Sequence, residues 1–291
     1  MAWIKTFLKK IMKTIECVWN ELFYRSFDLF SVGGKAKKNR ITLLWWNAKI
    51  NLGDYLACVV YDWMLKEKQL DKNKHVNDKK GLMTIGSIIT IGSVDAVVWG
   101  SGLLSVKRIP VLLAKSCYRK LDVRAVRGPL TRHVLVSAGY VCPEVYGDPA
   151  ILMPYIYCPT SRKKKFSVSV IEHFSKSEEL KRTDLNYINI ETYDYKYFID
   201  EVCASNKIVS SSLHGIILAE TYGVPAVFLS DGMEEQLFKF WDWYLSTGRT
   251  DIRVAKTLDE ALKMEPMPLP QLDEMRDKLI TCFPVDLWKE D

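Results

Sequence analysis

The sequence of 291 residues is 48% hydrophobic and 26% charged. This composition is typical of a folded globular protein and excludes the disordered and collagen-like classes. The formal net charge of +6 is a modest excess. It suits anionic small molecules, lipid headgroups and nucleic acid equally, so charge alone selects no partner. At roughly 100–200 residues per domain, the length predicts two domains.

Seven cysteines are scattered along the chain without a C-x-x-C pair. Such a set is typical of reduced thiols in the cytosol, and it favours neither a disulfide framework nor a metal site. No apolar run reaches the roughly 20 residues of a membrane-spanning helix. Lysines between positions 5 and 13 also interrupt the apolar core that a secretory signal needs. We therefore expect a cytoplasmic protein without a metal.

Residues 1–30 are predicted to form an amphipathic helix. Apolar residues recur at steps of three and four from Trp3 to Phe23, and four lysines precede the first acidic residue, Glu16. A basic helix with aromatic side chains on its apolar face can lie in an anionic membrane surface. It can equally pack on its own domain or on a second subunit. Peripheral attachment to the inner face of a membrane and a homo-oligomer are therefore both left open.

Two α/β blocks are expected after a linker that is rich in glycine and lysine. The first spans residues 41–153, the second spans residues 166–265, and a helical tail covers residues 266–291. Apolar runs that alternate with helical patterns, without hairpin signals, predict parallel sheets with helices on both faces. The expected strands are 41–46, 82–85, 95–99, 123–127, 166–171, 187–190, 207–210 and 226–229. The expected helices run from 51 to about 66, from after Arg127 to about 138, from 195 to 205 and from 212 to 222. Two such domains would place strand ends and helix N-termini along a shared cleft.

The strongest local signal is the run from 209 to 225, in which a strand ends in three serines and a helix begins at once. Ser211 or Ser212 is a good N-cap. His214 then lies in the first helical turn, where backbone N–H groups and the helix dipole attract anions. We expect His214 to donate a proton or to hold a phosphate, although a histidine merely hydrogen-bonded there remains the alternative. Glu220 lies about 240° further round the helix, so we do not pair it with His214 as acid and base.

Further polar residues follow the ends of the predicted strands. Asn51 and Asp54 lie at a strand-to-helix turn that suits hydroxyl or amide contacts, although Asp54 can equally cap the helix. The glycines of 100–102 let a backbone approach a ligand closely. Arg127 follows a strand and is suited to a bidentate clamp on phosphate or carboxylate. Asp148 is by default a turn former that can also reach a sugar hydroxyl.

Taken together, these motifs resemble those of the polysaccharide pyruvyl transferases. The matching segments are, in order, 51–54, 98–102, 126–131 with Gly139, 146–150, 210–225 and 238–249. The resemblance covers residues 43–249 and implies a glycosyltransferase-B-like fold, with two Rossmann-like domains that face each other across a cleft. It also implies ketal formation from phosphoenolpyruvate without metal or other cofactor.

The resemblance also implies roles for individual residues. His214 and Arg127 are expected to be catalytic. The donor, phosphoenolpyruvate, is expected to contact Ser211, Ser212, Leu213, Lys239 and Arg249. The acceptor, a glycan or lipid-linked oligosaccharide, is expected to contact Asn51, Asp54, Ser101, Asp148 and Glu220, and no nucleic acid is expected. Some family members carry an arginine where this chain has Ser212, and Arg127, Lys239 or Arg249 is expected to replace that cation.

Two other functions fit the same residues. A nucleotide-sugar-dependent glycosyltransferase would use the same fold and the same anion-binding helix N-terminus. A non-catalytic sugar-binding protein of this fold would need neither donor.

Overall fold

The computed structural model describes residues 42–72, 81–92, 94–159, 161, 163–172, 182–230, 232 and 237–288. The amphipathic helix expected at residues 1–30 lies outside this part of the chain and stays a prediction. Within the described residues, no helix has both the length and the apolar character needed to cross a bilayer.

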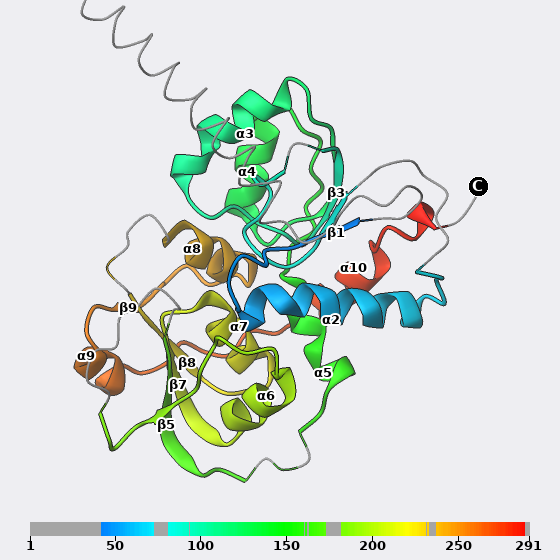
Figure 1. Cartoon of the computed structure of the whole chain (residues 1–291). Coiled ribbons are helices and arrows are strands. Elements are labelled where there is room, and N and C mark those ends of the chain that lie inside the picture. Colours follow the sequence, from blue (N-terminus) through cyan, green and yellow to red (C-terminus); the bar gives the residue numbers. More distant parts are fainter. Residues whose placement is uncertain are drawn as a thin grey trace, which may run out of the picture.

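The first sheet contains four parallel strands in the order β1-β2-β3-β4 (Figure 1). They are β1 (Thr42–Leu44), β2 (Gly81–Met83), β3 (Ala96–Trp99) and β4 (Leu121–Ala125). Every residue of β2 and β3 is buried. A strand covered on both faces reads as a continuous apolar run, which is the pattern that the sequence shows at these positions.

The second sheet contains five parallel strands in the order β6-β5-β7-β8-β9. They are β5 (Phe166–Ile171), β6 (Asn186–Tyr187), β7 (Ser205–Ser210), β8 (Ala226–Leu229) and β9 (Val254–Ala255). The expected parallel α/β fold is confirmed, and each of the eight expected strands has a counterpart. The two-residue strand β9 has none among the expectations.

Helices connect the strands and cover the sheets. The longer ones are α2 (Leu52–Glu67), α3 (Ile109–Ser116), α4 (Pro129–Ser137), α6 (Tyr195–Cys203), α7 (Leu213–Thr221), α8 (Leu237–Ser246), α9 (Leu258–Lys263) and α10 (Asp273–Thr281), and α5 (Met153–Ile156) is a single turn. The expected helices correspond to α2, α4, α6 and α7. α4 begins with Pro129 directly after Gly128, a position where the missing N–H of proline costs nothing.

One apolar core joins the two sheets. It includes Leu52 of α2, Trp99 of β3, Ile217 of α7 and Leu279 of α10, all fully buried. The 3-10 turn Pro149–Leu152 contacts α2, α7 and α10. In Figure 1, α2 runs between the upper and the lower sheet. The division into two Rossmann-like domains facing across a cleft, and its boundaries, stay predictions.

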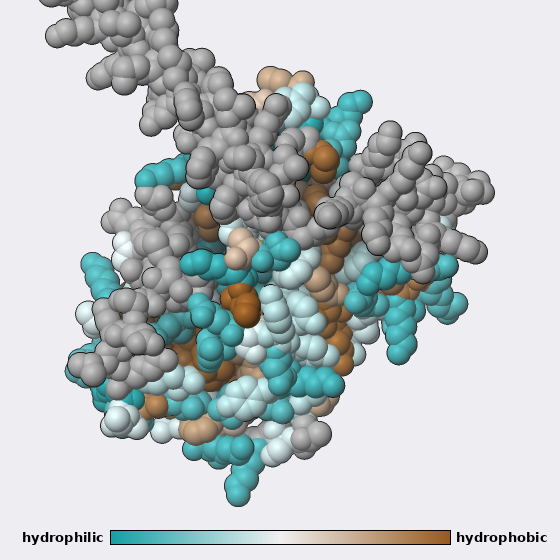
Figure 2. Space-filling view, viewed as in Figure 1, coloured by the Kyte–Doolittle hydropathy of each residue, from teal (hydrophilic) through white to brown (hydrophobic). Residues whose placement is uncertain are grey.

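The outer surface is largely polar on the face shown in Figure 2. Hydrophilic side chains cover most of the described surface there, and apolar ones gather in small areas between them. This distribution agrees with a core that collects apolar side chains from both sheets, since burial of apolar area is the main favourable contribution to folding.

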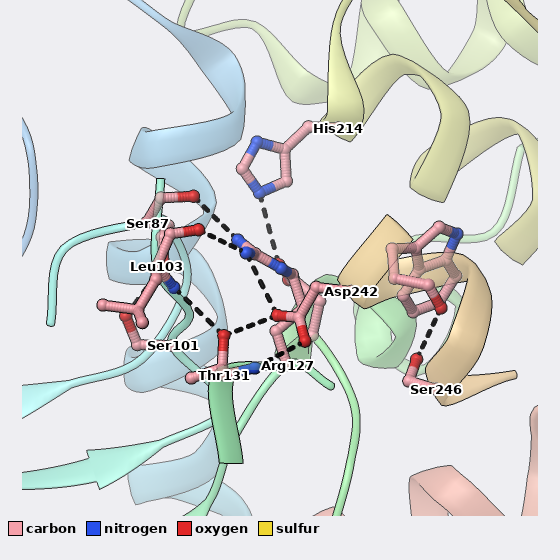
Figure 3. Close-up of polar contacts among 11 residues, drawn as sticks. Ser87, Ser101, Leu103, Arg127, Thr131, His214, Asp242 and Ser246 are labelled. Carbon is pink, nitrogen blue, oxygen red and sulfur yellow. Dashed lines mark hydrogen bonds and ion pairs between the residues drawn. The ribbon is translucent and has the colours of Figure 1, made fainter. Parts of the chain in front are cut away.

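A buried ion pair connects the start of α4 with α8. Nη2 of Arg127 lies 3.1 Å from Oδ2 of Asp242, and the two side chains are 1% and 0% exposed. Thr131 donates to the same carboxylate from its backbone N at 2.9 Å and from its hydroxyl at 2.6 Å (Figure 3). A Cβ at Gly128 would overlap the backbone oxygen of Asp242, so only glycine allows this approach. The Arg-Gly-Pro-Leu-Thr motif therefore holds α8 in place.

We predict that Asp242→Ala lowers the free energy of unfolding by about 3–5 kcal/mol, because it leaves the Arg127 guanidinium buried without its counter-ion. Urea denaturation followed by circular dichroism measures the change. Asp251→Ala is the control, because Asp251 pairs with Arg253 at an exposed site where its side chain is 83% accessible. Equal stability of the two variants would contradict a structural role for the buried pair.

Candidate functional site

A cavity of about 210 Å³ lies where the N-termini of α2 and α7 meet the turn after β2. Six of the residues expected from the sequence line it: Asn51, Asp54, Ser212, Leu213, His214 and Lys239. Its volume is below the roughly 300–1,000 Å³ of pockets for drug-sized ligands. The cavity therefore suits a small ligand or one end of a larger one.

The other lining residues were not expected from the sequence. They are Trp46, Ser87, Ile88, Thr90, Ile91, Leu104 and Arg108. Several lie in the turn after β2, which the sequence marks only by the pair Gly86-Ser87. Arg108 lies just before α3, a helix without a counterpart among the expected elements. With Arg108 and Lys239 the lining contains two cationic side chains, which favours an anionic ligand.

His214 lines the cavity and faces the buried Asp148, which is not part of the lining. Nε2 of His214 lies 3.5 Å from Oδ2 of Asp148, and the two side chains are 12% and 1% exposed. Both atoms are buried, and neither has a hydrogen-bond partner among the described residues. The other carboxylate oxygen accepts a hydrogen bond from the backbone N of Ala150. A proton on Nε2 would satisfy both buried atoms after a small approach, so Asp148 is placed to fix the orientation of the imidazole ring.

The close packing of α7 on α2 fixes the His214 ring. A Cβ on Gly53 would overlap its Nδ1, so the glycine of the Asn-Leu-Gly-Asp motif makes room for the imidazole. Ser212 is the N-cap of α7 as expected, but its side chain makes no capping bond. Instead, Oγ of Ser210 accepts a hydrogen bond from the backbone N of Ser212. The N-cap, expected at Ser211 or Ser212, is Ser212. The hydroxyl that accepts the hydrogen bond from its backbone N belongs to Ser210, the last residue of β7.

Asp54 brings a carboxyl group into the same cluster. Burial raises the pKa of this carboxyl from 3.8 to about 6, and the nearby Asp148 also raises it, while His214 and Lys239 act in the opposite direction. Gly86, with φ at +109°, lets the chain turn beside the Asp54 carboxylate. A carboxyl that gains and loses a proton near neutral pH is suited to acid–base chemistry.

Comparison with known proteins assigns the family. The family described as polysaccharide pyruvyl transferase matches residues 3–232. The chain belongs to this family. Uncharacterized protein L143 of Acanthamoeba polyphaga mimivirus is 28% identical over 215 residues, which cover 68% of this chain and 70% of that protein. Succinoglycan biosynthesis protein ExoV of Rhizobium meliloti (strain 1021) is 27% identical over 217 residues, covering 71% of this chain and 64% of ExoV. The chain thus matches slightly less than two thirds of the length of ExoV.

In this member of the family, Arg127 lies behind the wall of the cavity and does not line it. Its guanidinium is fully buried and donates to Ser87 Oγ and to the backbone oxygen of Leu103, both at 2.7 Å (Figure 3). The expected bidentate clamp on a ligand is therefore wrong for this structure, because the fork of the guanidinium is already used by protein oxygens, including those of Asp242.

Glu220 and Arg249 are also absent from the cavity lining, because they pair with each other. Nη2 of Arg249 donates to Glu220 at 2.8 Å, and Trp243 Nε1 donates to the same carboxylate at 2.9 Å. The side chains of the pair are 11% and 2% exposed. This pairing corrects the expected ligand contacts of both residues. It agrees with the inference that Glu220 and His214 do not share a helix face.

Two serines that were expected to contact the ligand lie outside the cavity lining and form hydrogen bonds to the backbone of neighbouring segments. Ser101 is fully buried and donates to the backbone oxygen of Gly86 at 2.8 Å. Ser211 is buried, and its backbone N donates to Ile171 at 3.0 Å. Neither lines the cavity, because these strand ends are covered by the turns that they hold. Among the described residues, no group of three or more histidine, cysteine or acidic side chains is placed to hold a metal ion.

We predict that Asp54→Asn stabilises the fold at neutral pH. Because the folded-state pKa of about 6 lies above the ordinary 3.8, the ionised carboxylate destabilises the folded protein. This penalty is absent below about pH 4, grows up to about pH 6 and is complete above it. The free energy of unfolding of the variant should exceed that of the parent by roughly 1–3 kcal/mol at pH 7.5, with the difference closing towards pH 4.

Urea denaturation across this pH range tests the prediction. Asp62→Asn is the matched control, since it changes an exposed carboxylate on the same helix. A gain that is the same at every pH would show that the amide stabilises the site for another reason. Activity should fall in Asp54→Asn, because the same carboxyl is part of the proposed site.

Proposed function

We propose that this protein transfers the three-carbon unit of phosphoenolpyruvate to two hydroxyls of a sugar, forming a cyclic pyruvate ketal and releasing phosphate. The observation that carries the proposal is that His214, which faces the buried Asp148 carboxylate, lines the same small cavity as Asp54. Membership of the pyruvyl transferase family supports the same reaction.

The first step is proton transfer to carbon. Protonated His214 gives its proton to the methylene carbon of phosphoenolpyruvate, which becomes a methyl group, and positive charge develops on the neighbouring carbon. The buried carboxylate of Asp148, 3.5 Å from Nε2, would set the orientation of the ring. General acid catalysis of this kind typically contributes roughly 10²–10⁴-fold to the rate.

Two additions then complete the ketal. The first sugar hydroxyl forms a C–O bond to the cationic carbon and loses its proton to a base, for which we propose the ionised carboxylate of Asp54. Cleavage of the bond between this carbon and the phosphate oxygen releases phosphate, and the second hydroxyl takes its place. Of the two hydroxyl protons, one replaces the proton that His214 supplied and the other leaves with phosphate.

Cationic groups would hold the donor throughout these steps. Lys239 and Arg108 line the cavity, and the N-terminus of α7 at Ser212 directs backbone N–H groups towards the same space. They would stand in for the arginine that some family members carry in place of Ser212. Phosphoenolpyruvate carries a phosphate and a carboxylate, which matches a site with more than one such group.

The acceptor is proposed to be a glycan or a lipid-linked oligosaccharide, modified at the inner face of the membrane. ExoV, the relative named in succinoglycan biosynthesis, supports an acceptor of this class. A nucleotide-sugar glycosyltransferase or a non-catalytic sugar-binding protein would behave differently with phosphoenolpyruvate and acceptor. The former releases nucleoside diphosphate from a sugar nucleotide, and the latter consumes neither donor. Mass spectrometry of the glycan with and without the protein would detect a gain of one pyruvate ketal.

We predict that His214→Ala lowers turnover by at least about 10²-fold, because it removes the general acid. Acceptor-dependent phosphate release from phosphoenolpyruvate measures the loss. His133→Ala, at an exposed position on α4, is the matched control and should retain the parent rate. Near-parental turnover in a folded His214→Ala protein would remove the assignment of His214 as the acid.

A further inference from the structure

Ser87 lines the cavity, and its hydroxyl accepts a hydrogen bond from the buried guanidinium of Arg127. Nη1 of Arg127 donates to Ser87 Oγ at 2.7 Å. The Arg127 side chain is 1% exposed, whereas Ser87 is half-buried and lines the cavity. In Figure 3, the guanidinium lies between Ser87 and Leu103 on one side and Asp242 on the other. The serine therefore stands between the buried charge and the space for a ligand.

The direction of this hydrogen bond decides what the serine can do next. A guanidinium has only donors, so Ser87 Oγ must be the acceptor. A serine has a single O–H, which is left to donate elsewhere. No other described group accepts a hydrogen bond from this hydroxyl. A donated bond from a cation polarises the hydroxyl and strengthens the bond that it makes in turn.

The backbone around Ser87 is fixed by two neighbouring motifs. The oxygen of Gly86 accepts hydrogen bonds from Ser101 Oγ at 2.8 Å and from the backbone N of Gly102 at 3.0 Å. A Cβ on Gly102 would overlap the guanidinium of Arg127, so glycine is required for the cation to reach Ser87. The Gly-Ser-Gly motif thus positions both ends of the Arg127–Ser87 bond.

We propose that Ser87 binds the donor substrate by donating a hydrogen bond to an anionic oxygen of its phosphate or carboxylate, and that Arg127 is the positioning residue that orients this hydroxyl. The identity of the donor as phosphoenolpyruvate rests on the function proposed above. The anionic class of the ligand is supported independently by Lys239 and Arg108 in the same lining. Arg127 thus acts on the ligand through Ser87 and not by direct contact.

Equilibrium binding of phosphoenolpyruvate, and separately of inorganic phosphate, tests the proposal. Trp46 lines the cavity, so tryptophan fluorescence can report binding, with calorimetry as a second readout. Ser87→Ala should weaken phosphoenolpyruvate binding by roughly 10–100-fold, the usual effect of losing a hydrogen bond to a charged group. Ser87→Thr keeps the hydroxyl and should stay within a few fold of the parent. Ser116→Ala, which removes a hydroxyl on α3 that lies outside the cavity lining and donates to Leu113, is the matched control and should leave binding unchanged.

A double-mutant cycle tests the positioning role. Arg127→Lys should weaken binding in the parent background but add little in the Ser87→Ala background, because both changes remove the same contact. Equal losses in the two backgrounds would show that Arg127 does not act through Ser87 and would overturn the positioning role. Circular dichroism checks folding of the Arg127 variant, and the Ser87 series tests the hydroxyl even if that variant fails to fold.

The outcomes separate this inference from the proposed reaction. If the parent consumes phosphoenolpyruvate and Ser87→Ala binds it as tightly as the parent, the role of Ser87 is wrong and the reaction stands. If the parent binds phosphate through Ser87 but does not consume phosphoenolpyruvate, the reaction is wrong and the anion contact stands. Absence of binding of either probe to the parent would overturn both.

Discussion

The fully buried ion pair between Arg127 and Asp242 is the interaction on which the rest of the site depends. Two opposite charges without water are stable only when their remaining polar atoms are also satisfied, and Thr131, Leu103 and Ser87 supply most of those contacts. The pair brings the helix that carries Lys239 against the first sheet. It also places a guanidinium directly behind the cavity wall, where solvent does not reach it.

Close approaches at glycines bring the remaining groups together. Gly53 lets α2 pack on the His214 ring, and Gly102 gives the guanidinium its path to Ser87. A side chain at either position would need the space that a functional group already occupies. Gly53 therefore links the packing of α2 to the position of His214, and Gly102, in the loop after β3, links that loop to the position of Arg127 and Ser87.

The cluster of Asp54, Asp148 and His214 shows a conflict between stability and function. Burial makes the ionised form of Asp54 costly and raises its pKa to about 6. The same burial excludes water from the reaction space and strengthens each electrostatic contact there. In the reaction proposed above, Asp54 takes up a proton, which would explain a carboxyl that the fold alone does not favour.

Much of the architecture was predictable from sequence, because it depends on local periodicity. Apolar runs predicted strands β1 to β8 and the helices that begin near Asn51, Pro129, Tyr195 and Leu213, and the serine run predicted His214 at a helix start. Residue type alone could not show what each polar side chain contacts. Arg127, Arg249 and Glu220 look like ligand contacts in the sequence, but partners more than 20 residues away bind them in the fold.

The roles of Ser87 and Arg108 depend on where a turn and an unexpected helix place them, and the pKa of Asp54 depends on burial. Those properties come from tertiary packing, which sets distance and solvent access between segments that the sequence keeps apart.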